Sequence, residues 1–441
     1  MKFEIRIGRE VIESNAGLAL AGKILTGLER EVKRLDDIEI PGMLEPRIGN
    51  GDVVRSYVGL LVLGRTNYED IELFRQHGYF RRTLGIKRVP SCETLRQRLD
   101  ASAGRFDAVL QEVNVALLGQ VKLTPVRTNL GQYMPVDVDV SPFDNSGSRK
   151  EGVGRTYKGE DGYAPNFAYL GTEGHMLNCE LRPGTQHCQK GTPEFLRETF
   201  SFAERLGLGM PVLLRMDSGN DAAENIARCP PGCRYIVKRN LRRESLEGWL
   251  AVAKTHGAAM QPRLGKTVYL GECTRRVDLG NGRVEELRIV FEVTERTSLA
   301  NGQALLMPKL DVETWWTNLK ESPASVIELY HEHGTSEQFH SELKTDMGVE
   351  RLPSGKFATN GTVLRAAMVG FNLLRRIGQE LLALPDVLPV AVTAGRRRLR
   401  SVLQDLMYLG CRYVRTARRH LLNLGANSPW ARACVLLYAR L

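Results

Sequence analysis

The sequence predicts an α/β protein with a mixed sheet, a β-rich insertion and helical regions at both ends, and three observations support this. The segment YMPVDVDVS, residues 133–141, alternates apolar and polar side chains as a strand does. Helical segments and short apolar strands then alternate, as in TPEFLRETFSFAERLG followed by MPVLLRMD. Between residues 241 and 309 the pattern becomes polar and strand-rich, with a GNG turn between KTVYLGECTRRVDL and VEELRIVFEVTE.

The composition indicates a soluble protein that handles a polyanion. The 441 residues are 42% hydrophobic and carry a formal net charge of +10, which favours nucleic acid as the partner. The sequence contains no run of eighteen apolar residues, so it predicts no membrane span. The first ten residues, MKFEIRIGRE, lack the apolar core of a secretory signal. We therefore expect a cytoplasmic protein whose eight cysteines are reduced.

The N-terminal 120 residues predict a helical region that contacts DNA. Short helices lead to a glycine turn at Gly85, and a further helix begins after the N-cap candidate Ser91. Leu95 and Leu99 are spaced for a buried stripe, so we expect the arginines between them, Arg96 and Arg98, to face outward. This order of elements is typical of a helix-turn-helix, although a plain helical bundle has the same pattern.

The C-terminal tail is rich in arginine. Residues 391–441 hold ten arginines, no lysine and one aspartate. The apolar residues of RRRLRSVLQDLMYLGCRYVRTARRHLLNLG recur at helical spacing, which predicts basic helices. So many positive charges repel one another unless an anion lies beside them. We therefore expect Arg396, Arg397 and Arg398 to contact the phosphate backbone of a nucleic acid.

One predicted helix, YHEHGTSEQFHSELK, places four reactive side chains on one face. At about 100° per residue, Tyr330, His333, Glu337 and Lys344 fall within an arc of roughly 60°. Leu329, Phe339, Leu343 and Met347 form a separate apolar stripe. A solvated polar face beside a core face would give the same pattern.

Carboxylates at two predicted strand ends suggest a metal site. Asp139, with Asp137 two residues earlier on the same face, ends one strand, and Asp217 ends VLLRMD. Each can also be a turn or helix cap. With Glu337 they would form an oxygen cage for Mg²⁺, and two such ions clamp the oxygens of a phosphodiester.

The chain resembles bacterial insertion-sequence transposases of the Asp-Asp-Glu type, which have a ribonuclease-H-like catalytic domain. The subclass signature Y-x2-R-x3-E-x6-K is matched by Tyr330, Glu337 and Lys344, whereas His333 stands at the arginine position. VDVDVS resembles the first-aspartate strand of the family and MDSGND the second. The 120 positions between Asp217 and Glu337 resemble the subclass's β-rich insertion.

The resemblance implies a DNA transposase that binds the terminal inverted repeats of its element, cleaves the phosphodiesters and joins the ends to target DNA. Asp139, or Asp137 as the alternative, would ligate two Mg²⁺ ions together with Asp217 and Glu337, and Mn²⁺ may substitute. Phosphate contacts would come from basic and polar side chains: Tyr330, His333, Lys344, Arg96, Arg98, Lys238, Arg239 and Arg396 to Arg398. The resemblance also implies a homodimer or larger assembly on DNA and a bacterial protein associated with the nucleoid.

The expected domains are a helical region (1–120), two catalytic parts (121–240 and 311–385), the β-rich insertion (241–310) and a basic helical tail (386–441). Two alternatives remain open. One is a catalytically silent DNA-binding protein derived from a transposase, and the other is a stand-alone ribonuclease-H-like nuclease. In some relatives an inserted tryptophan stacks on a flipped base, but a core position is the favoured interpretation for Trp249, Trp315 and Trp316.

Overall fold

The structure is a computed structural model that describes residues 3–42, 46–242, 244–280, 282–417 and 419–441. The chain divides into two compact units. The helical unit consists of Met1–Val121, Phe143–Tyr163 and His340–Leu441, and the sheet unit consists of Lys122–Pro142 and Ala164–Phe339. Among the described residues, no helix is both long and apolar enough to cross a membrane.

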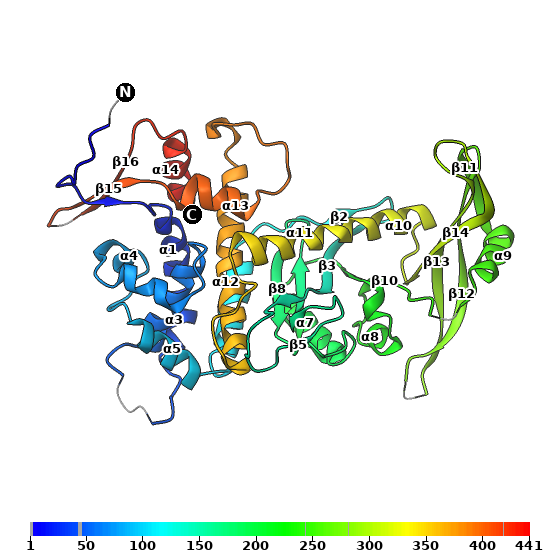
Figure 1. Cartoon of the computed structure of the whole chain (residues 1–441), viewed down its shortest axis with the longest axis horizontal. Helices are drawn as coiled ribbons and strands as arrows, with labels where there is room; N and C mark the ends of the chain where they lie inside the picture. The colour runs from blue at the N-terminus through cyan, green and yellow to red at the C-terminus, as the bar shows by residue number, and fades with distance from the viewer. Residues whose placement is uncertain (1–2, 43–45, 243, 281, 418) are drawn as a thin grey trace. The chain divides into compact units, whose positions relative to one another are not determined.

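The sheet unit is built on one large mixed sheet, which confirms the expected α/β class (Figure 1). Its strand order is β11-β12-β13-β14-β10-β9-β3-β7-β8, with the short β2 (Val126–Arg127) paired to β3. The central strands β3 (Gln132–Val140), β9 (Val212–Met216) and β10 (Arg234–Lys238) are parallel, and β7 (Asn166–Leu170) and β8 (His175–Glu180) continue the sheet antiparallel. Parallel strands are buried on both faces, which explains the mostly apolar run of β9.

The β-rich insertion extends the same sheet. Its strands β11 (Gly257–Arg263), β12 (Lys266–Asp278), β13 (Val284–Ser298) and β14 (Ala304–Thr317) form an antiparallel meander. The last of these pairs with β10, so the meander is continuous with the central strands. Helix α9 (Leu246–His256) packs on the meander through Trp249, whose ring centroid lies 5.9 Å from that of Phe291.

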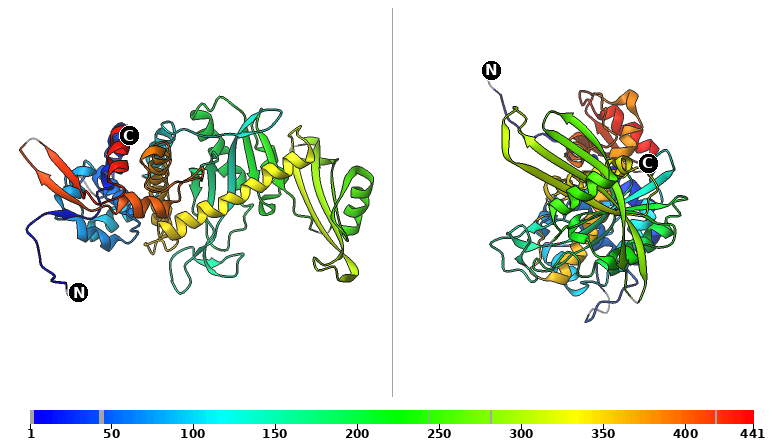
Figure 2. Two further views of the ribbon diagram at one scale, coloured as in Figure 1. Left: turned by 90° about the horizontal axis from the view of Figure 1, so that it is seen from above. Right: turned by 90° about the vertical axis from the view of Figure 1, so that its right-hand side faces the viewer.

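A long helical run crosses one face of the sheet (Figure 2, left). It begins as α10 (Pro323–His331), tightens to a 3₁₀ turn (Glu332–Thr335), continues as α11 (Ser336–Ser341) and widens to a π turn (Glu342–Asp346). A Cβ at Gly174, in the turn between β7 and β8, would lie 2.3 Å from the Phe339 ring. The turn therefore needs glycine where the helix approaches it. The other helices of this unit are α7 (Thr192–Arg205), α8 (Ala223–Ala227) and a 3₁₀ turn (Ser218–Asn220).

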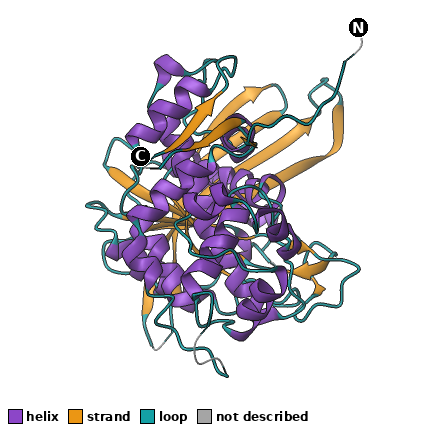
Figure 3. Cartoon of the chain, turned by 90° about the vertical axis from the view of Figure 1, so that its left-hand side faces the viewer, coloured by secondary structure: helices purple, strands orange, loops and turns teal. Residues whose placement is uncertain are grey.

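The helical unit gathers around one long helix, α12 (Phe357–Leu382). Figure 3 draws the helices of the chain in purple. Four N-terminal helices pack on it: α1 (Leu18–Gly27), α3 (Asn50–Leu61), α5 (Cys92–Ala101) and α6 (Asp107–Leu118). The remaining elements are α2 (Glu29–Lys33), a 3₁₀ helix (Tyr68–Phe74), α4 (Gly78–Thr83), a 3₁₀ turn (Pro385–Val387), α13 (Leu399–Val402), a π turn (Leu403–Met407) and α14 (Ala431–Arg440).

Two small sheets complete the helical unit. One has the order β1-β15-β16, with β1 (Ile12–Glu13), β15 (Cys411–Arg415) and β16 (His420–Leu424). The other has the order β4-β6-β5, with β4 (Phe143–Asp144), β5 (Gly154–Arg155) and β6 (Asp161–Tyr163).

Two features differ from the sequence-based expectations. The expected second catalytic part ran to residue 385, but the sheet unit ends at Phe339, and α12 packs on the N-terminal helices. The tail was expected to be helical throughout, whereas residues 411–424 form the β15–β16 hairpin. In CRYVRTARRHLLNL a short polar turn separates two runs of strand-like residues, and pairing with β1 gives them a third strand.

Candidate active site

Two carboxylates meet at the ends of neighbouring parallel strands. β3 and β9 are in register with Val138 opposite Met216, so Asp139 and Asp217 follow at the next position of each strand. Both side chains are partly exposed. Burial and the charge of Asp139 raise the pKa of Asp217, which shows that the two carboxylates repel each other. The structure thus brings together two of the predicted site residues.

A buried ion pair between Asp137 and Arg215 joins the two strands that carry these carboxylates. Asp137, two residues before Asp139, accepts two bonds from Arg215, at 2.6 Å from Nε and 2.8 Å from Nη2. Arg215 also donates from Nη1 to the Leu329 carbonyl at 2.7 Å and to Glu332 at 3.3 Å. Burial alone would raise the pKa of Asp137, but Arg215 and His333 hold it below its usual range. Both carboxylate oxygens of Asp137 are therefore occupied by the protein.

His333 joins the same buried group. Its Nδ1 lies 2.9 Å from Oδ1 of Asp137, and the side chain is buried. Burial opposes the charged imidazolium, yet the charge of Asp137, its hydrogen bond and the charge of Asp139 raise the pKa of His333. At the position of the signature arginine, the imidazole thus links the helical run to β3 in the interior of the sheet unit.

Glu337 lies one helical turn after His333 and is exposed. The 3₁₀ turn Glu332–Thr335 lies between the two residues and changes the phase of the helix before α11 begins. Two residues later, the Phe339 ring lies 5.0 Å from the Tyr169 ring of β7. Within the described ranges, no three His, Cys, Asp or Glu side chains are clustered closely enough to hold a metal ion. The structure therefore brings Asp139 and Asp217 together, and Glu337 is not clustered with them, so its place in the predicted cage stays a prediction.

The other two signature residues lie in different surroundings. Tyr330 is nearly buried, and its ring lies 5.6 Å from Trp315 and 5.7 Å from His333. Burial and the nearby charges of Asp217 and Asp139 raise the pKa of its phenol. Lys344 belongs to the π turn in the helical unit, where its Nζ lies 5.7 Å from the centre of the Phe143 ring.

The three tryptophans near the insertion are core residues, as the sequence favoured. Trp249, Trp315 and Trp316 are all buried. The indole of Trp249 donates to Glu244 at 2.8 Å, and that of Trp316 donates to Asp221 at 2.9 Å.

The two arginines of α5 have different surroundings. Arg96 is exposed, but the expectation that Arg98 faces outward is wrong. Its guanidinium is buried and donates to the Ile48 carbonyl at 3.0 Å and to Oδ1 of Asn50 at 2.7 Å. The cause is helical geometry, because Arg98 follows Leu95 by three residues and shares its buried face. The expected N-cap is confirmed, since Ser91 accepts from the Thr94 amide at 3.2 Å.

The basic pair at the end of β10 is engaged with carboxylates of the sheet unit. Lys238 is ion-paired with Glu313. Arg239 is buried, bonds to Glu244 at 2.6 Å and lies 4.5 Å from the ring centre of Trp316.

The arginine run of the tail is also paired within the protein. Arg396 pairs with the buried Glu342, which Arg375 holds from the other side at 2.7 Å. Arg397 pairs with Asp405, and Arg398 bonds to Asp346 at 2.8 Å. These internal carboxylates neutralise charge that the composition alone assigned to an outside anion. Of the three, Arg398 has the most exposed side chain, at 50%.

Sequence reasoning missed three residues of the site: Arg215, Glu332 and Asn220. An arginine inside the apolar strand VLLRM was the available signal for Arg215, because a buried charge requires a partner. Asn220 donates to Asp217 at 3.0 Å from the turn that follows β9. Its role depends on the turn geometry, which the sequence does not specify.

The carboxylate oxygens of Asp139 and Asp217 fit a hard divalent cation. Carboxylate oxygens are the ligands that such ions prefer. Burial first, and the charge of Asp139 second, raise the pKa of Asp217, and a bound cation would favour its charged form. Asp139 and Asp217 are the residues that would hold it first, since Asp137 is already bound on both oxygens.

The chain was compared with known proteins. The model of the family "Transposase DDE domain group 1" matches residues 10–441. No curated protein matches the chain significantly. Among solved structures, the piggyBac transposase synaptic complex with hairpin DNA is similar at 11% identity, covering 90% of this chain and 80% of that one, with a TM-score of 0.37. A TM-score this low does not establish a common arrangement.

The family match spans nearly the whole chain, and DDE transposases generally use divalent metal ions, as the carboxylate pair suggests. The chain therefore belongs to the transposase DDE domain group 1 family and is a DDE transposase, an enzyme of DNA recombination.

Proposed function

We propose that this transposase binds the terminal inverted repeats of its element, hydrolyses the phosphodiester at each end and transfers the freed 3′-hydroxyl to target DNA. The pairing of Asp139 with Asp217 at adjacent parallel strand ends carries the proposal. Ligands of α/β sheets bind outside the carboxyl ends of such strands. Strand pairing around β3 and β9 also supports a ribonuclease-H-like core.

We assign the catalytic carboxylates to Asp139, Asp217 and Glu337. Asp139 is preferred over Asp137 because Asp137 is buried and bonded to Arg215 and His333, whereas Asp139 is partly exposed. Two Mg²⁺ ions, for which Mn²⁺ can substitute, would supply a Lewis acid and an activated water at the phosphodiester when bound.

The chain's own groups would position these carboxylates. The bond from Asn220 orients Asp217, and the Arg215–Asp137 pair fixes the strand that carries Asp139. The helical run is held to the sheet by His333, and in this proposal it would carry Glu337 to the two aspartates.

The phosphates of the DNA would be held by cationic and polar groups of both units. Tyr330 and Lys344 of the signature are proposed for the element end, with Arg96 and Arg398 as exposed cations of the helical unit. Two ends must be joined in one reaction, so we propose that the enzyme acts as a homodimer or larger assembly.

Replacing Glu337 by Gln tests the proposal, because the amide keeps the size but loses the charge that binds a cation. The assay is Mg²⁺-dependent cleavage of a duplex carrying the element's own end. Glu328→Gln is the matched control, since Glu328 is an exposed glutamate of the same helical run that belongs to none of the proposed sites. We expect Glu337→Gln to bind the end without cutting and the control to cut normally.

The other outcomes are equally informative. Equal cutting by wild type and Glu337→Gln would remove Glu337 from the site. End binding without cutting by either protein would favour a silent DNA-binding protein. Equal cutting of random duplex and element ends would favour a stand-alone nuclease.

A further inference from the structure

The helical unit begins with an extended segment that lacks a partner strand. Residues 3–11 enter β1, and in Figure 1 they form a single trace that leaves the small sheet. Phe3, Ile5 and Ile7 alternate with Glu4 and Arg6, which is the pattern of a strand with one apolar face. All three apolar side chains are at least 85% exposed. We call residues 3–9 the N-terminal arm.

The base of the arm is fixed to β15. The carbonyl of Val11 accepts from the Tyr413 amide at 3.0 Å, and Glu10 lies 3.4 Å from Arg412. Upstream of Glu10, none of the described arm residues takes part in the sheet. The arm is thus a strand-like segment tethered at one end, with an uncovered apolar face.

The same small sheet has an open edge on its other side. β16 is the outer strand of the order β1-β15-β16 and has no further strand partner among the described residues. A groove beside it is lined by Leu422 and Leu424 of β16 and by Val435 and Leu436 of α14. Val435 is 60% exposed. An open edge with an apolar groove is the surface to which an extended segment adds.

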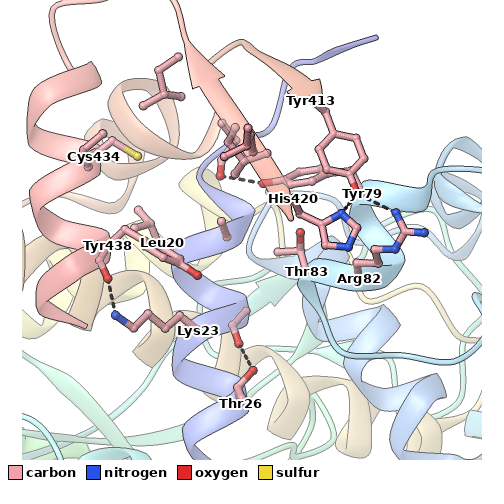
Figure 4. Close-up of a pocket in the computed structure, with 17 residues that line it drawn as sticks. Leu20, Lys23, Thr26, Tyr79, Arg82, Thr83, Tyr413, His420, Cys434 and Tyr438 are labelled. Atoms are coloured by element: carbon pink, nitrogen blue, oxygen red, sulfur yellow. Dashed lines mark hydrogen bonds between the residues drawn. The ribbon is translucent and has the colours of Figure 1, made fainter. Parts of the chain in front are cut away.

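An adjoining cavity of about 450 Å³ lies between α1, α4, the hairpin and α14 (Figure 4). Leu422 and Leu424 line this cavity as well, together with Leu20 and Tyr438. Protein interiors are closely packed, so an apolar hollow of this size beside an open strand edge is a surface suited to apolar side chains. Leu422 and Leu424 lie on the same face of β16, and apolar side chains of a further strand would cover them on that face.

We propose that the N-terminal arm of one chain adds as a strand to β16 of a second copy. Its backbone would pair with the open edge, and Phe3, Ile5 and Ile7 would cover the groove between β16 and α14. The exchange is reciprocal, because each copy offers one arm and one edge, as a two-fold dimer requires. This inference does not depend on the proposed reaction.

The length of the arm favours a second copy over its own chain. The arm leaves from β1, and a new strand beyond β16 lies three strand spacings away, about 14 Å. Residues 3–7 must lie along β16 to pair with it. The fixed end is Val11, whose carbonyl is bonded to Tyr413, and the four Cα–Cα steps from Val11 to Ile7 span at most about 14 Å. A path to the far side of β16 must also rise over β15 and β16, which makes it longer than this. The arm is therefore too short to cover the edge of its own sheet.

The test is the oligomeric state of the full chain without DNA, measured by sedimentation velocity at micromolar concentration. We expect a dimer for the wild type and a monomer for the variant Ile5→Lys/Ile7→Lys. The matched control is Glu4→Gln/Arg6→Gln, which changes the opposite face of the arm and should leave the dimer intact. Val435→Lys changes the groove at an exposed position and should also give a monomer.

Cross-linking identifies which chains are joined. Ile5→Cys and Asn423→Cys are placed in separate chains, mixed and treated with a short thiol cross-linker. A cross-linked pair containing one chain of each kind supports exchange. A monomeric wild type, or a dimer that all variants retain, would overturn the proposal. Cross-linking only when both cysteines are in one chain would show that the arm folds back on its own sheet, which also overturns it.

Discussion

Asp137 and Arg215 face each other on adjacent parallel strands and are joined by two hydrogen bonds of 2.6 and 2.8 Å in the interior of the sheet unit. Removing one partner of a buried ion pair leaves the other charge uncompensated. We therefore expect Asp137→Asn to lower the free energy of unfolding by about 3–5 kcal/mol, measured by urea denaturation.

Asp139→Asn should affect activity and not stability, in contrast to Asp137→Asn. Asp139 is partly exposed, and its charge raises the pKa of the neighbouring Asp217. We expect this variant to unfold at the wild-type urea concentration or slightly above it, but to lose Mg²⁺-dependent cleavage. If Asp137→Asn is stable and inactive while Asp139→Asn is active, the assignment of the two aspartates is reversed.

Restoring the arginine of the signature at position 333 should not improve the protein. His333 is buried against Asp137, so a longer side chain must displace its neighbours. Overpacking of this kind costs about 1–3 kcal/mol, which thermal unfolding would detect for His333→Arg. Tighter binding to the element end at unchanged stability would instead show that the side chain reaches the DNA.

Stability should depend on pH through His333. Its pKa is raised in the folded protein by Asp137, against the effect of burial. The stabilisation is therefore complete below the unfolded pKa of about 6.5 and is lost as pH rises through the folded value. We expect the difference in unfolding free energy between wild type and His333→Gln to shrink as pH rises from 6 to 9. A difference that does not change with pH would exclude a charged imidazole.

The arginines around the tail should differ in role, some stabilising the fold and others contacting DNA. Glu342→Gln leaves the fully buried Arg375 without a counter-charge and should cost about 3–5 kcal/mol in unfolding free energy. Arg398→Ala removes a half-exposed arginine from the buried Asp346 carboxylate, which keeps Arg400 and its backbone amide as partners, so this variant should cost less than Glu342→Gln. If Arg398 contacts a phosphate, this variant should weaken end binding and reduce the salt slope of the affinity by about 1. An unchanged slope would assign Arg398 to structure alone.

The sequence predicted the carboxylate pair because its signals are local. Asp139 and Asp217 each end a recognisable strand, and strand ends in an α/β sheet converge. The large mixed sheet and the strand-rich insertion were predictable for the same reason, since periodicity and turn residues mark them.

The positions of the charged side chains were not predictable, because their partners are distant in sequence. Arg396 meets Glu342 across 54 positions, and His333 meets Asp137 across 196.

The helical wheel that placed Tyr330, Glu337 and Lys344 on one face assumed a regular α-helix. The 3₁₀ turn at Glu332–Thr335 and the π turn at Glu342–Asp346 change that phase, and they arise from packing.

The discontinuity of the helical unit has a consequence for how the protein is made. Helices α3 and α6 are synthesised early, but α12, against which they pack, comes near the end of the chain. At 5–20 residues per second, a ribosome needs about 10–50 s to add the roughly 240 residues between them. During that time the early helices expose apolar surface that only the finished chain covers. Translation that stops before α12 should therefore release a chain whose first helices cannot complete their core.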